Sequence, residues 1–131
     1  MGRMGSHFPQ AHLTRPAQEV AGGLERRFTQ GGELLTELSR SALPIPERLE
    51  HFGAKYWDWR DDCAAFLERV FSTSEIEQSY AEIAIEKSSE PAGFADLLRD
   101  IALGLQRDIS FLVRLHNGLR AYDASPRPEA R

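Results

Sequence analysis

Apolar residues recur every three or four positions between residues 49 and 70, and this repeat restricts the fold more than any other feature. The repeating positions are Leu49, Phe52, Tyr56, Trp59, Cys63, Phe66 and Val70. Such spacing places side chains on one face of an α-helix, because about 3.6 residues complete a turn. The stretch therefore predicts a long amphipathic helix that begins near Pro46, in its first turn, and ends near Phe71.

The same repeat occurs before and after this stretch, between breaks rich in proline or serine. We expect helices over residues 17–39, over residues 75–87, and over about residues 91–122, the last being the longest. A capping box of Ser74 and Glu77 is predicted to open the third helix. No stretch shows the alternation typical of strands. The sequence thus predicts an all-α, up-and-down bundle of four main helices, with long second and last helices.

A glycine pair interrupts the apolar face of the first predicted helix. Gly31 lies on that face, and a glycine within a helix lowers its stability by about 1 kcal/mol relative to alanine. Two interpretations are open. Either Gly31 allows a neighbouring helix to approach closely, which we favour, or the helix breaks there.

Composition and charge narrow the class of protein. The 131 residues suffice for one core, which we assign to a domain over 17–122, with disordered polar tails at 1–16 and 123–131. A net charge of -4 argues against a general nucleic-acid binder. No apolar run reaches the roughly 18 residues of a membrane span, and the N-terminus lacks a signal peptide's apolar core. We therefore expect a cytoplasmic protein.

The only cysteine, Cys63, excludes an internal disulfide and fits a reducing compartment. Because Cys63 lies on the apolar face of the second predicted helix, we expect a buried, inert thiol. The sequence has no glycine-rich phosphate loop, no nucleophile elbow and no zinc-protease motif. We predict no catalytic, cofactor-binding or metal-binding residue.

The segment WDWRDD, residues 57–62, combines two tryptophans with three aspartates. Trp59 lies on the apolar face and is predicted to be buried, whereas Trp57 lies beside that face. Trp57 either covers the edge of the bundle or is an exposed anchor for a protein partner. The candidate partner-binding residues are Trp57, Asp58, Asp61 and Tyr122. Asp58 with Asp61 or Asp62 also has spacing compatible with a metal site, but such pairs are common on solvated helix faces.

The alternative function is a degenerate HEPN-like ribonuclease or an RNA-binding protein. Ribonucleases of that class carry an arginine and a histidine separated by a short spacer. Here eight residues separate Arg107 from His116, and one separates Arg114 from it, so the pattern is not met. A simpler interpretation places Arg107, Asp108, Arg114 and Arg120 on a solvated helix face.

Several positions together resemble a known module. They are Gly32, Leu34, Leu35, Trp59, Phe66, Leu67, Phe71 and Ser74. This pattern resembles the small helical module at the N-terminus of many bacterial anti-phage proteins that carry TIR or other effector domains. The resemblance covers about residues 20–122, and most of the matching positions are apolar. It implies a non-enzymatic protein–protein interaction or oligomerisation module, without a cofactor, that here stands alone. The expected partners are another protein and further copies of this chain, not nucleic acid or a membrane.

Overall fold

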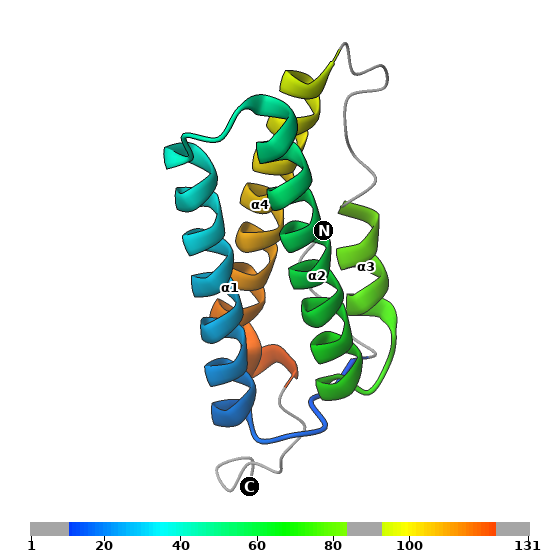
Figure 1. Ribbon diagram of the computed structural model, residues 1–131. Coiled ribbons are helices and arrows are strands. Elements are labelled where there is room, and N and C mark those ends of the chain that lie inside the picture. Colours follow the sequence, from blue (N-terminus) through cyan, green and yellow to red (C-terminus); the bar gives the residue numbers. More distant parts are fainter. Residues whose placement is uncertain (1–10, 84–92, 123–131) are drawn as a thin grey trace, which may run out of the picture.

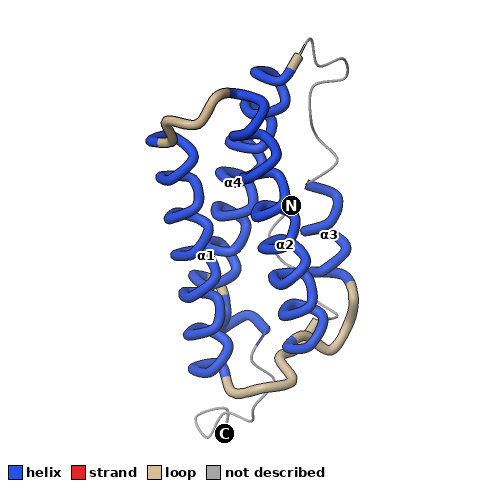
Figure 2. Tube along the Cα trace, in the orientation of Figure 1, coloured by secondary structure: helices blue, strands red, loops and turns tan. Residues whose placement is uncertain are grey.

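The computed structural model describes residues 11–83 and 93–122, which form an all-α bundle (Figure 1). The helices are α1 (Ala17–Arg40), α2 (Ile45–Val70), α3 (Glu75–Ile83), α4 (Phe94–Asn117) and a 3-10 helix, η1 (Leu119–Tyr122). Helices α1 to α4 run alternately up and down, and α4 packs against α1, α2 and α3 (Figure 2). The predicted fold class is confirmed.

Helix α2 matches the predicted second helix to within one residue at each end, and Pro46 lies in its first turn. It contains 26 residues, whereas α4 contains 24, so the expectation that the last helix is the longest was wrong. Helix α4 ends at Asn117 and is capped by Gly118, whose N–H donates to the carbonyls of Arg114 and Leu115. The 3-10 helix η1 follows directly after this cap. Residues 84–92, where we expected the end of the third helix and the start of the fourth, lie outside the described residues.

The start of α3 differs from the predicted capping box. The Glu75 N–H donates to the Thr73 hydroxyl, at 3.4 Å. The Ser74 hydroxyl instead accepts a hydrogen bond from Gln78 Nε2, at 3.1 Å. The cap therefore comes from Thr73, one residue before the predicted position.

The core runs along the axis of the bundle. The apolar face predicted for α2 is buried from Phe52 to Val70. Helix α1 continues unbroken through Gly31, where an added Cβ would lie 2.6 Å from Trp59 Cζ2. Gly31 therefore permits close packing of α1 on α2, as we favoured. Phe94, the first residue of α4, is exposed although it is apolar.

Part of the predicted N-terminal tail belongs to the bundle. Ala11 is buried, and Leu13 forms an isolated antiparallel bridge with Phe71. The Leu13 N–H donates to the Tyr122 carbonyl, and the Thr14 N–H donates to the Val70 carbonyl, both at 2.8 Å. The expectation of disorder over residues 1–16 was therefore wrong for this segment. Residues 1–10 and 123–131 lie outside the described residues.

Candidate functional site

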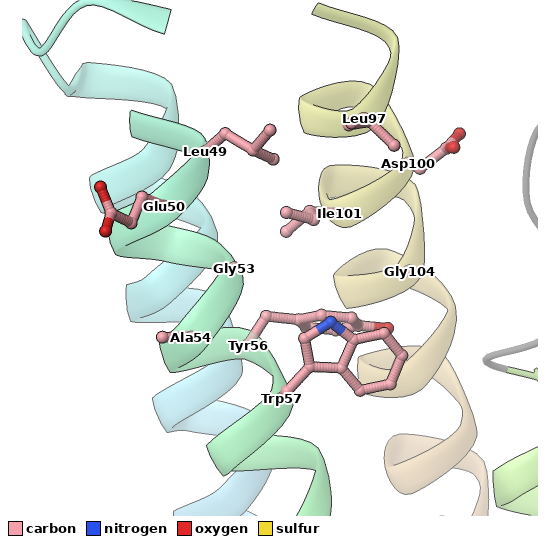
Figure 3. A pocket seen from close by; sticks show the side chains of 10 residues that line it. All are labelled: Leu49, Glu50, Gly53, Ala54, Tyr56, Trp57, Leu97, Asp100, Ile101 and Gly104. Atoms are coloured by element: carbon pink, nitrogen blue, oxygen red, sulfur yellow. The ribbon is translucent and has the colours of Figure 1, made fainter. Parts of the chain in front are cut away.

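A groove of about 410 Å³ lies between the first halves of α2 and α4 (Figure 3). It is lined by Leu49, Glu50, Gly53, Ala54, Tyr56, Trp57, Leu97, Asp100, Ile101 and Gly104. We call it the α2–α4 groove. The Arg60 guanidinium donates to the Tyr80 carbonyl of α3, so α3 meets α2 one turn beyond the groove. The groove therefore lies on the N-terminal side of this contact along α2.

Trp57 forms one wall of the groove and is 50% exposed. Its ring lies beside that of Tyr56, with the centroids 5.1 Å apart (Figure 3). Trp59 is only 8% exposed, and its indole N–H donates to the Arg27 carbonyl of α1 at 3.0 Å. The prediction that Trp59 is buried and Trp57 much more exposed is confirmed. The structure is consistent with both interpretations of Trp57, because the indole packs beside Tyr56 at the edge of the bundle and half of it stays exposed.

Glycines and Tyr56 shape the floor of the groove. An added Cβ at Gly104 would clash with the Tyr56 hydroxyl, so this glycine lets the phenol cross α4. The hydroxyl then donates to the Asp108 carboxylate, at 3.0 Å. At Gly53 an added Cβ would make an ordinary van der Waals contact with the Ile101 side chain, at 3.8 Å, so the glycine leaves room for about one methyl group. The floor is therefore fixed, because it is anchored to the buried core.

The charge of the groove has one sign. Glu50 and Asp100 are the ionisable residues among its lining side chains other than Tyr56, and none of the lining residues is basic. The remaining lining is apolar or aromatic, and Leu49 of α2 and Ile101 of α4 point toward each other across the gap (Figure 3). An acidic rim on an apolar groove favours a ligand that carries both apolar groups and positive charge.

A buried ion pair between α2 and α4, next to the groove, corrects one expectation. Asp108, predicted on a solvated face, is fully buried, and so is most of Arg60, for which no definite position was predicted. The Arg60 Nε lies 2.7 Å from Asp108 Oδ2. The guanidinium also lies 4.2 Å from the centre of the Tyr80 ring. Burial raises the pKa of Asp108, although the hydrogen bond and the charge of Arg60 act in the opposite direction.

The thiol of Cys63 is fully buried, as predicted. Burial raises its pKa to about 12, so the thiolate that a nucleophile requires is not formed near neutral pH. Burial likewise raises the pKa of Tyr56 and of Tyr80. The Cys63 thiol and the two phenols therefore keep their protons at neutral pH.

The other predicted partner-binding residues do not join Trp57 in the groove. Tyr122 is 2% exposed and packs edge-on against Phe71, so the expectation that it is a surface anchor was wrong. Asp58 lines a separate depression between α1 and α2, beside Glu33. Asp61 is exposed one turn after Trp57, outside the groove lining.

The residues of the ribonuclease alternative are not brought together. Arg107 and His116 are nine positions apart on α4, which places them on opposite sides of the helix at about 100° per residue. His116 Nε2 lies 2.8 Å from Glu25 Oε2 of α1, and its ring packs edge-on against Phe28. Arg114 is exposed. These positions match a helix surface and an α1–α4 contact better than a joint site.

Among residues 11–83 and 93–122, no group of three or more His, Cys, Asp or Glu side chains could hold a metal ion. Within the same residues, none of the helices combines the length and the apolar character needed to cross a bilayer.

The sequence did not identify most of the groove. Glu50, Asp100 and Gly104 carried no recognised motif, and Leu97 was not singled out. One signal was available: Gly53 and Gly104 each lie next to an apolar face of a long helix, where a missing side chain leaves space. Which glycines face each other depends on the pairing of α2 with α4, and a helical repeat alone does not specify that pairing.

Comparison of the chain with protein-family models, with curated proteins and with solved structures gave no match. The resemblance to the helical module of anti-phage proteins therefore rests on the sequence pattern alone.

Proposed function

We propose that this protein is a non-enzymatic helical interaction module, and that its α2–α4 groove binds an amphipathic helix of a protein partner. The observation that carries the proposal is the half-exposed Trp57 at the wall of an apolar groove with an acidic rim. Grooves between helices are a recurring binding site for the apolar face of a partner helix.

The apolar contribution comes from Trp57, Leu49, Leu97 and Ile101. Tryptophan is enriched among residues that dominate binding energy, because it buries a large area with few rotatable bonds. Tyr56 and Gly104 hold the floor in place through the bond to Asp108, so little ordering is required when a partner binds.

The rim selects the charge of the partner. Glu50, which is exposed and lines the groove, would attract a lysine or arginine beside the partner's apolar face, and it would repel an acidic residue. We therefore propose that the partner helix carries basic residues on both sides of its apolar face. The resemblance noted in the sequence supports the class of interaction module, and a role in anti-phage defence is proposed on that resemblance alone.

Binding to a pair of synthetic peptides tests the proposal. One is an amphipathic helix of leucine and lysine, and the other has every lysine replaced by glutamate. We expect saturable binding of the basic peptide, measured by tryptophan fluorescence in a Trp59→Phe background, in which Trp57 is the only reporter. The acidic peptide should not bind.

Two variants make the test specific. Trp57→Ala and Glu50→Lys should each weaken binding of the basic peptide at least about tenfold, measured by calorimetry because the first removes the reporter. Asp58→Lys makes the same charge change outside the groove and should leave binding nearly unchanged. Equal binding of both peptides, or equal losses in Glu50→Lys and Asp58→Lys, would refute a specific groove.

Self-association is the competing occupant of the groove. If a second copy fills it, light scattering of the protein alone should show a dimer that Trp57→Ala converts to a monomer. That result would replace the proposed partner helix by a second copy of this chain.

A further inference from the structure

A second groove, of about 460 Å³, lies between the start of α1 and the end of α2. These helix ends lie at the opposite end of the bundle from the start of α2 (Figure 1). The lining residues of this groove are Arg15, Gln18, Glu19, Gly22, Gly23, Arg26, Arg27, Phe66, Arg69 and Val70. We call it the arginine groove. Four of these ten residues are arginines and one is acidic, in a chain whose net charge is -4. The positive charge is therefore concentrated locally.

Two of the four arginines are engaged by nearby groups. Arg15 pairs with Glu19 at 3.7 Å on the surface. Arg27 is largely buried, donates from Nη1 to the Gly23 carbonyl at 3.1 Å, and lies 3.1 Å from the Asp62 carboxylate. Arg26 and Arg69 are both exposed, and neither forms an ion pair with any residue in the described part of the chain. Their guanidinium groups are therefore available to an anion.

Phe66 holds two of the guanidinium groups beside the groove. The Arg27 guanidinium carbon lies 4.1 Å from the centre of the Phe66 ring, and that of Arg69 lies 5.7 Å from it. Gly23 makes this arrangement possible, because an added Cβ there would clash with the Phe66 ring. The positive groups are thus positioned before any ligand arrives.

Gly22 is a second feature of the arginine groove. A glycine destabilises a helix interior relative to alanine, and it usually has a packing reason to be there. At Gly22 an added Cβ would meet nothing within 4 Å, so the packing of the bundle does not require this glycine. The absence of a side chain at Gly22 makes the arginine groove deeper at this point.

We propose that the arginine groove binds the phosphoryl group of a small soluble ligand. Arg26 and Arg69 supply hydrogen-bond donors, since a guanidinium group matches the geometry of phosphate oxygens and can bind two of them at once. Arg27 supplies a fixed buried charge behind them. A single phosphate or diphosphate suits the groove better than a nucleic acid, whose binding requires an extended basic surface. This site is separate from the α2–α4 groove and does not depend on the function proposed for it.

The test is an NMR titration of the isotope-labelled protein with inorganic phosphate and with pyrophosphate, at constant ionic strength. We expect saturable shifts of the Gly22 and Gly23 amides and of the Nε–H groups of Arg26 and Arg69. Pyrophosphate should bind more tightly than phosphate, because it presents more charge to the same donors.

Variants separate site binding from general attraction. The double variant Arg26→Gln/Arg69→Gln should lose at least about tenfold in affinity for pyrophosphate. Arg40→Gln, which removes one exposed charge at the opposite end of α1, should bind nearly as well as the parent protein. Gly22→Leu keeps every charge but fills the groove, so it should also weaken binding. Circular dichroism confirms that each variant is folded.

Three results would overturn the proposal. The first is a linear, non-saturating response to pyrophosphate. The second is an equal loss in Arg40→Gln and in the double variant, which would indicate nonspecific attraction. The third is tighter binding of single-stranded RNA, with affinity that increases with its length, which would identify a nucleic-acid surface instead of a site for a small ligand.

Discussion

The Arg60 guanidinium and the Asp108 carboxylate lie 2.7 Å apart inside the bundle, on helices α2 and α4. Asp108 is fully buried, and its carboxylate also accepts a hydrogen bond from the Tyr56 hydroxyl. Arg60 also donates to the Tyr80 carbonyl, at 2.5 Å, so the pair joins α2, α3 and α4. A buried pair of this kind fixes how the helices align, because any other register would leave a charge without its partner.

Removal of one partner of this pair should destabilise the protein strongly. We expect Asp108→Ala to lower the free energy of unfolding by about 3–5 kcal/mol, because it leaves the Arg60 charge buried and uncompensated. Urea denaturation at neutral pH measures this change. The Arg60→Met/Asp108→Leu double variant should recover most of the loss, because apolar side chains need no partner. If the double variant were less stable than Asp108→Ala, the ion pair would contribute net stability.

The two tryptophans should respond differently to truncation. Trp59→Ala should lower the free energy of unfolding by about 3–5 kcal/mol, because it empties a large site in the core and removes the hydrogen bond to Arg27. Trp57→Ala should leave the melting temperature within a few degrees, because half of that side chain is exposed. Thermal unfolding of both variants compares them. Similar losses would mean that both indoles contribute to the core and would remove Trp57 as a binding anchor.

Adjacent glycines of α1 offer a matched pair of substitutions. Gly31→Ala would place a methyl group 2.6 Å from Trp59 Cζ2 and 3.0 Å from Ile109 Cγ1. Overpacking of about 1–3 kcal/mol then outweighs the gain of about 1 kcal/mol in helix propensity, so we expect a net loss of up to about 2 kcal/mol. Gly32→Ala meets nothing within 4 Å and should stabilise by up to about 1 kcal/mol. Chemical denaturation of both variants tests the contrast, and equal stabilisation would show that Trp59 moves freely.

The helices of this protein follow from its sequence, because each helix has an apolar face with a regular repeat. The face of α4 shows where that reasoning fails. Its buried positions include Leu105, Asp108 and Leu112, spaced by three and four, whereas an apolar repeat would place Ile109 in the middle. Asp108 occupies a core position since Arg60 comes from another helix to neutralise it. A single-helix pattern contains no information about that partner.

The candidate site was only partly predictable for a similar reason. Trp57 could be identified as exposed because it lies beside the apolar face of its own helix. The groove around it depends on the distance between α2 and α4, which is set by Gly104 and the hydroxyl of Tyr56. Tyr122 was misplaced because its burial depends on Phe71 and on the residues around Leu13, which pack at the end of the bundle. The segment around Leu13 is too short to show a helical repeat, so its packing against Tyr122 could not be predicted from the sequence.

Alkaline pH should weaken the fold through Cys63. Burial raises the pKa of this thiol from 9.0 to about 12, so between these values the folded protein binds more protons than the unfolded chain. Stability therefore falls as pH rises, by about 1.4 kcal/mol between pH 8 and pH 10 for one such group. Tyr56 and Tyr80, whose pKa values burial also raises, add to the loss at higher pH. Urea denaturation at pH 8 and pH 10 measures the difference, and Cys63→Ala should reduce it by about that amount although it lowers stability at both pH values. An unchanged pH dependence in Cys63→Ala would mean that the thiol reaches solvent before the bundle unfolds.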